Sequence, residues 1–69
     1  MTLTKKQPYW GLKKQIAIKG LKQADVANEI GMDITTFNLK LNRSNGRDFY
    51  FSEVSKIARY LKIHPSDFF

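Results

Sequence analysis

Apolar residues recur at intervals of three and four along most of this chain, which is the spacing of one face of an α-helix. They form the sets Tyr9, Leu12 and Ile16; Val26, Ala27 and Ile30; Ile34, Phe37 and Leu41; and Val54, Ile57, Ala58 and Leu61. We predict helices over 9–19, from Lys22 and Gln23 to about 30, over 34–42 and over 53–61. A last short turn follows at 64–67, and Phe68 and Phe69 are expected to close the core. The pattern thus predicts an all-α fold, a compact bundle of about five short helices.

Residues 23–42, QADVANEIGMDITTFNLKLN, are the stretch around which the rest of the chain is organised. Gly31 can take the left-handed conformation that ends a helix, and the Asp33 side chain can cap the next one. The stretch is therefore predicted to be a helix, a tight turn and a second helix. A corner between two helices of a small bundle, without a role in nucleic-acid binding, has the same pattern.

Polar residues interrupt the helical spacing over residues 43–51, RSNGRDFYF. Asn45-Gly46 is a turn signal, and Phe49 and Phe51 are two apart, as on one face of an extended segment. We expect both Phe side chains to point inward and Tyr50 outward. Ser52 is expected to cap the helix that follows.

A chain of 69 residues is expected to form one domain, because a small protein cannot divide its core further. We expect residues 1–8 to be a flexible N-terminal arm and 9–69 to be the domain. The sequence shows no signal peptide and no long apolar run, so we expect a cytoplasmic protein that does not bind membranes. It has no Cys, one His and six scattered carboxylates, and we therefore expect no catalytic site, metal, cofactor or small-molecule substrate.

The net charge of +6 favours a polyanionic partner. Six lysines, Lys5, Lys6, Lys13, Lys14, Lys19 and Lys22, come before the first acidic residue. Lys40, Arg43 and Arg47 form a second basic group after the helix-turn-helix stretch. Many basic surfaces are merely solvated, so charge alone does not establish nucleic-acid binding.

The outward face of the helix over 34–42 is predicted to carry Thr35, Asn38, Leu39 and Asn42, with Ile34, Phe37 and Leu41 inward. Thr and Asn are poor helix formers, and an ordinary surface would more naturally carry Glu, Lys or Ala. An Asn amide can pair with adenine, and Leu39 can touch a thymine methyl group. This composition favours a recognition surface for DNA, although an apolar and polar face of this kind also suits a protein partner.

These residues resemble the Cro/CI-type helix-turn-helix regulators, the XRE family. The resemblance covers about Tyr9 to Phe69 and rests on Gly20-Leu21-Lys22-Gln23, Val26-Ala27, Ile30-Gly31, the TTFxxKLN element over 35–42, and the later Ile57-Ala58, Leu61 and Ile63. It is closest to small temperate-phage proteins of the Cro or modulator-of-repression kind. The resemblance implies a lambda repressor-like domain with its second motif helix in the major groove.

The resemblance also implies which residues bind DNA. Base-reading positions are Gln23, Ile34, Thr35, Asn38 and Leu39. Backbone-contacting positions are Thr36, Asn42 and Arg43, to which the basic residues Lys22, Lys40 and Arg47 are added from the charge pattern. The chain departs from the family in two ways: Ile34 and Leu39 are apolar where relatives commonly have Gln, Arg or Ser, and Lys40 stands where an aliphatic residue is usual, with Leu41 expected to take its place in the core.

Two functions follow as alternatives. The first is a transcriptional regulator that binds double-stranded DNA, as a homodimer on two half-sites. The second is an antirepressor that binds a CI-type repressor protein through an apolar patch of Trp10, Ile34, Leu39 and Tyr50.

Overall fold

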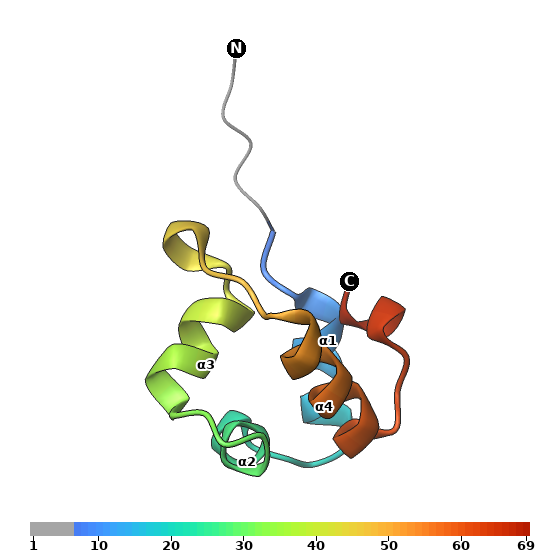
Figure 1. Ribbon diagram of the computed structural model, residues 1–69. Coiled ribbons are helices and arrows are strands. Elements are labelled where there is room, and N and C mark those ends of the chain that lie inside the picture. The colour runs from blue at the N-terminus through green and yellow to red at the C-terminus, as the bar shows by residue number, and fades with distance from the viewer. Residues whose placement is uncertain (1–6) are drawn as a thin grey trace.

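The computed structural model describes residues 7–69, and helices are the only regular secondary structure in this part of the chain (Figure 1). The elements are α1 (Trp10–Ile18), α2 (Gln23–Glu29), α3 (Ile34–Leu41), the 3-10 turn η1 (Ser44–Gly46), α4 (Phe51–Leu61) and the 3-10 turn η2 (Pro65–Phe68). The predicted all-α class is confirmed, with four α-helices and two 3-10 turns among the described residues in place of about five helices. Most of the predicted arm, including Lys5 and Lys6, lies outside the described residues.

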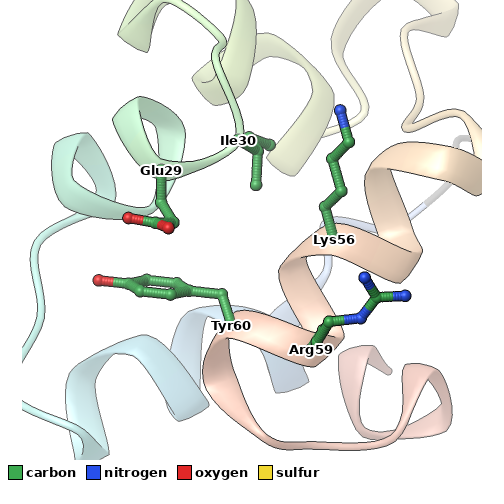
Figure 2. A pocket seen from close by; sticks show the side chains of 5 residues that line it. All are labelled: Glu29, Ile30, Lys56, Arg59 and Tyr60. Atoms are coloured by element: carbon green, nitrogen blue, oxygen red, sulfur yellow. The ribbon is translucent and has the colours of Figure 1, made fainter.

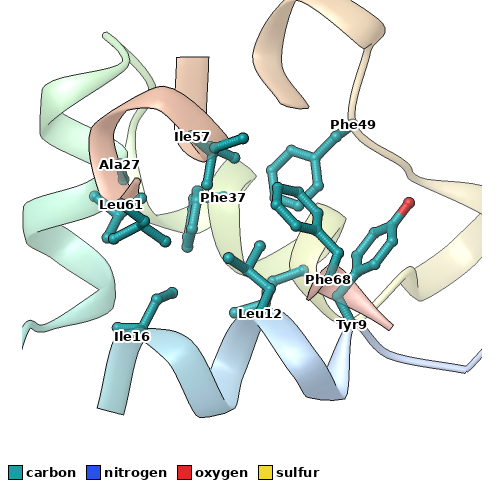
Figure 3. Close-up of a cluster of buried hydrophobic side chains, with 12 residues drawn as sticks. Tyr9, Leu12, Ile16, Ala27, Phe37, Phe49, Ile57, Leu61 and Phe68 are labelled. Atoms are coloured by element: carbon teal, nitrogen blue, oxygen red, sulfur yellow. The ribbon is translucent and has the colours of Figure 1, made fainter. Parts of the chain in front are cut away.

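One core lies between the four helices, as Figure 3 shows. Its buried members are Tyr9, Leu12, Ile16, Val26, Ala27, Phe37, Leu41, Phe49, Ile57, Ala58, Leu61 and Phe68. The Phe37 and Phe49 ring centroids are 5.5 Å apart, and those of Phe49 and Tyr9 5.6 Å apart. Burying a phenyl ring contributes about 1.5–3 kcal/mol to folding, so this row of rings joins α3 to the segments on either side of it.

The turn between α2 and α3 forms as predicted. Gly31 has a φ of +74°, and its N–H donates to the Asn28 carbonyl at 3.1 Å. The N–H of Met32 donates to the Ala27 carbonyl at 2.9 Å, which completes a Schellman ending for α2. Only glycine takes this backbone conformation without strain, so the sequence determines the place of the turn.

Two aromatic predictions are wrong. Phe51 was expected to point inward, but it is 84% exposed because α4 begins at Phe51 and ends the extended alternation after Phe49. The Glu53 carboxylate accepts the N–H of Tyr50 at 2.8 Å, so Tyr50 and not Ser52 is the N-cap residue. Phe69 was expected in the core, but it is 76% exposed, and Phe68 alone is buried there.

The C-terminal turn η2 packs directly on the start of α1. A Cβ atom at Gly11 would lie 2.2 Å from the carbonyl oxygen of Asp67 and 2.5 Å from that of Phe69. Gly11 therefore permits a backbone contact that a side chain would prevent. The periodicity of the sequence contains no signal for this contact, because it joins the two ends of the domain.

Candidate nucleic-acid interface

The first turn of α3 is stabilised by its own cap. An Asp33 carboxylate oxygen accepts the Thr36 N–H at 3.0 Å, and the other accepts the Thr36 hydroxyl at 2.7 Å. These hydrogen bonds lower the pKa of Asp33 below its ordinary value. The predicted cap is confirmed, and the Thr36 hydroxyl is used within the protein.

The exposed face of α3 carries four of the predicted base-reading residues. Thr35 is exposed, while Asn38 and Leu39 are half-buried, and neither Thr35 nor Asn38 has a side-chain hydrogen bond within residues 7–69. Ile34 is 40% exposed, so the prediction that it points into the core is wrong. Met32, just before the helix, packs against the core instead.

Lys40 lies inside the protein at the other end of α3. It is only 8% exposed, and its Nζ donates to both carboxylate oxygens of Glu53, at 2.9 and 3.0 Å. The same Nζ lies 4.2 Å from the centre of the Tyr50 ring. Leu41 is fully buried and occupies the core position, as expected.

Asn42, the C-cap residue of α3, is also bonded within the fold. Its Oδ1 accepts the Lys13 Nζ at 2.6 Å, and its Nδ2 donates to the Asn38 carbonyl at 2.9 Å. The ammonium group of Lys13 lies 4.7 Å from the centre of the Trp10 ring. These contacts join the end of α3 to α1.

Arg43 follows α3 in a left-handed backbone conformation, with φ of 55°. Its Cζ lies 4.2 Å from the Tyr9 ring centre, and its Nη2 lies 3.3 Å from an Asp48 carboxylate oxygen. Nη1 donates to the Gln7 carbonyl at 3.4 Å. Arg43 therefore connects the end of α3 to the start of the described chain and to the following loop.

The Tyr9 hydroxyl donates a hydrogen bond to the same Asp48 carboxylate. Partial burial alone would raise the pKa of Asp48, but the hydrogen bonds from Tyr9 and the Phe49 N–H and the charge of Arg43 outweigh it and lower the pKa. Burial, and then the hydrogen bond to Asp48, raise the pKa of Tyr9. Asp48 is thus most stable as a carboxylate in the folded protein.

The predicted DNA-binding residues therefore separate into two groups. Seven keep their side chains available on the surface or at its edge: Lys22, Gln23, Ile34, Thr35, Asn38, Leu39 and Arg47. Four make contacts within the protein: Thr36, Lys40, Asn42 and Arg43. Of the first group, Ile34, Thr35, Asn38 and Leu39 belong to α3, Lys22 and Gln23 lie at the N-terminal end of α2, and Arg47 follows the η1 turn.

The predicted apolar patch does not gather at one point of the surface. Trp10 and Tyr50 are 58% and 70% exposed and lie near the C-terminal end of α3, beside Lys13 and Lys40. Ile34 stands at the opposite end of that helix, about 10 Å away along its axis. Phe51 and Phe69 are exposed aromatic residues that the sequence reasoning missed, because it placed both in the core.

An open hollow of about 280 Å³ lies between α2 and α4 (Figure 2). It is lined by Glu29, Ile30, Lys56, Arg59 and Tyr60, and by no residue of α3.

Within the part of the chain that the structure describes, no group of His, Cys, Asp and Glu could hold a metal ion. No helix of this part is long and apolar enough to cross a membrane.

Two short helices that meet at a tight turn, on a single helical core and with an exposed second helix, define a helix-turn-helix domain. A family model described as the Cro/C1-type HTH DNA-binding domain matches residues 11–69. The chain belongs to this family, whose domains bind double-stranded DNA and serve in regulation. Comparisons with curated proteins and with solved structures found no match.

Proposed function

We propose that this protein is a sequence-specific transcriptional regulator of the phage Cro/repressor type, with α3 in the major groove of its operator. An α-helix is about 10–12 Å across, and the major groove of B-DNA is about 12 Å wide. The observation that carries the proposal is the exposed face of α3, where Thr35 and Asn38 have no side-chain hydrogen bond within the described residues.

Each residue on this face has a chemistry that suits a base edge. The Asn38 amide can donate to N7 or accept from N6 of adenine, in the geometry that Asn commonly uses. Ile34 and Leu39 suit thymine methyl groups, and Thr35 suits either a base or a methyl group. Gln23, at the first position of α2, is proposed as a further base or phosphate contact, because its amide can donate and accept hydrogen bonds.

The phosphate contacts are proposed for Lys22 and Arg47, both exposed, with the remaining surface cations adding long-range attraction. Lys40, Asn42 and Arg43 are not included, because a phosphate contact would require each to leave a partner within the protein. Two copies on half-sites about 34 Å apart would match successive major grooves.

The test starts from a duplex that the protein enriches from a randomised DNA pool. Asn38→Ala is expected to weaken binding to this duplex about tenfold or more and to leave binding to an unrelated duplex unchanged, because a bidentate base contact is worth about 1–3 kcal/mol. Asn28→Ala, at an exposed position of α2, is the matched control and should change neither. Equal losses on both duplexes would count against base reading by Asn38.

A second function, binding to a CI-type repressor protein, is favoured by four exposed aromatic side chains. Trp10, Tyr50, Phe51 and Phe69 are each more than half exposed, and aromatic residues are enriched in the centres of protein interfaces. Titration against such a repressor at high salt would test this function. A complex that resists salt, blocks the repressor's operator binding and is weakened by Phe51→Ser would support it, and no complex would exclude it.

A further inference from the structure

We propose that Lys40 and Glu53 act as positioning residues for DNA recognition, by fixing the rotation of α3 about its own axis. This inference rests on the proposed function, since the orientation of α3 matters most if its exposed face reads bases. Neither side chain is proposed to touch DNA.

The ion pair joins α3 to the backbone of α4. Lys40 Nζ contacts both carboxylate oxygens of Glu53, and the exposed fractions of the two side chains are only 10% and 19%. The same Glu53 carboxylate accepts the N–H of Tyr50, the N-cap residue of α4. A continuous series of polar contacts therefore runs from α3 to the start of α4.

The Tyr50 ring restricts the ammonium group from another side, with its centre 4.2 Å from Nζ. Such a cation–π contact is directional, because the cation is attracted to the ring face. Carboxylate and ring together define one position for the end of the Lys40 side chain. The burial of Phe37 and Leu41 already selects the face of α3 that meets the core, and the ion pair adds a directional contact at the end of the helix.

An ion pair can position α3 without making the protein more stable. Removing two charges from water costs about as much as their attraction returns, so an apolar residue in place of a largely buried ion pair is often no less stable. The pair does impose a direction that an apolar contact would not. A rotation of α3 by about 10° moves an atom 5 Å from its axis by about 1 Å, which is enough to weaken a hydrogen bond to a base.

A phosphate contact by Lys40 makes a different prediction. Phosphate contacts add affinity for every DNA sequence and steepen the dependence of binding on salt. A positioning residue instead affects only the duplex whose bases are read. The ratio of affinities for the enriched and the unrelated duplex therefore distinguishes the two roles.

The decisive variant is the double substitution Lys40→Met with Glu53→Gln, which removes both charges while the Gln carbonyl still accepts the Tyr50 N–H. We expect a melting temperature close to that of the unmodified protein, an approximately tenfold loss of affinity for the enriched duplex, and no loss for the unrelated duplex. Lys40→Arg keeps the ion pair and should retain the preference for the enriched duplex over the unrelated one. Glu53→Gln alone leaves the largely buried Lys40 ammonium group without its carboxylate, so it is expected to be less stable than the double variant.

Equal losses on both duplexes with a shallower salt dependence would show a phosphate contact and overturn the proposal, as would full discrimination by the folded double variant. Backbone residual dipolar couplings of α3 measured without DNA provide an independent check, since their periodic variation along the helix should shift or lose amplitude when α3 rotates about its axis in the double variant. Unchanged couplings would also overturn the positioning role. Failure of the proposed function would look different, because the unmodified protein would then enrich no duplex.

Discussion

The two ends of α3 differ in what their polar side chains do. At the first turn, the Asp33 carboxylate accepts hydrogen bonds from the neighbouring Thr36, and Ile34 and Thr35 remain exposed. At the last turn and just beyond it, Lys40, Asn42 and Arg43 bond to α4, to α1 and to the residues around Tyr9 and Asp48. We refer to these as the exposed end (33–36) and the anchored end (40–43).

The comparison shows that a polar residue on a DNA-binding helix need not be a DNA contact. Lys40 and Arg43 are cations in the second basic group of the chain, yet both have carboxylate partners in the protein. Because the anchored end fixes the orientation of α3, the side chains of the exposed end need not pack against the protein. The division gives one short helix both a fixed position and a free surface.

The largest loss of stability is expected when a core side chain in the middle of α3 is truncated. Phe37 is fully buried in the middle of α3, and Phe37→Ala should destabilise the protein by about 3–5 kcal/mol. Urea unfolding followed by circular dichroism measures the loss. Exposed Phe51→Ala is the control and should change stability by less than about 0.5 kcal/mol. Similar losses for the two would contradict the placement of these rings.

The two arginines on either side of the η1 turn are expected to differ in function: Arg43 stabilises the anchored end, and Arg47 lies on the surface. Arg43→Ala removes the contacts to Asp48, Tyr9 and Gln7 and is expected to cost about 1–3 kcal/mol of stability. Arg47→Ala should leave stability unchanged within about 0.5 kcal/mol but weaken binding to all duplexes. Thermal melting and fluorescence anisotropy with DNA would measure the two effects. The reverse assignment, with Arg47 needed for folding, would refute this division.

Low pH is expected to weaken the contacts of the anchored end, because Arg43 is paired with the Asp48 carboxylate. Because the folded state lowers the pKa of Asp48, its stabilising effect is present above the ordinary carboxyl pKa and is lost as the pH falls through the folded-state value. Asp48→Asn is therefore expected to be less stable than the parent at neutral pH, with a difference that shrinks below about pH 4. Urea unfolding at several pH values tests this, and a difference independent of pH would contradict it.

At the exposed end, the stability of Asp33→Asn can be compared with that of the parent over the same pH range. The pKa of Asp33 is also lowered, so its contribution is lost over the same acidic range. Asn caps a helix nearly as well as Asp, and we expect a smaller change at neutral pH than for Asp48→Asn. A larger loss for Asp33→Asn would mean that the exposed end is the more important one for stability.

The smallest change in stability is expected at Thr35. Thr35→Ala should leave stability unchanged or raise it by a few tenths of a kcal/mol, because Ala is the better helix former. The same substitution should weaken binding to the enriched duplex several-fold, which anisotropy titration would detect. A clear loss of stability without any change in DNA binding would remove Thr35 from the proposed recognition surface.

Much of the fold could be predicted because the deciding interactions are local. The spacing of Leu12 and Ile16, and of Phe37 and Leu41, identified the buried helical faces, and Gly31 with Asp33 identified the turn. The error at Phe51 arose because α4 begins two residues earlier than predicted, and the error at Phe69 arose because the η2 turn ends at Phe68. A boundary shift in a helix turns a side chain to another face, so exposure there could not be read from spacing.

The candidate site was predicted only in part for a related reason. The outward positions of Thr35 and Asn38 follow from helical periodicity, because Phe37 and Leu41 face the core. Nothing in the periodicity indicated that Lys40 and Arg43 would be held within the protein, because a cation on a helix has the same pattern whether it faces water, a phosphate or a distant carboxylate.

The sequence by itself determined the helices, the turn of the motif, the Asp33 cap and the core faces in the middle of each helix. These depend on contacts between residues a few positions apart, which folding elsewhere does not alter. Only the tertiary structure decided that Lys40 would meet Glu53, that Asn42 would meet Lys13, and that Tyr9, Arg43 and Asp48 would form one cluster. Those pairings join residues from different elements, and their geometry exists only after the helices have packed.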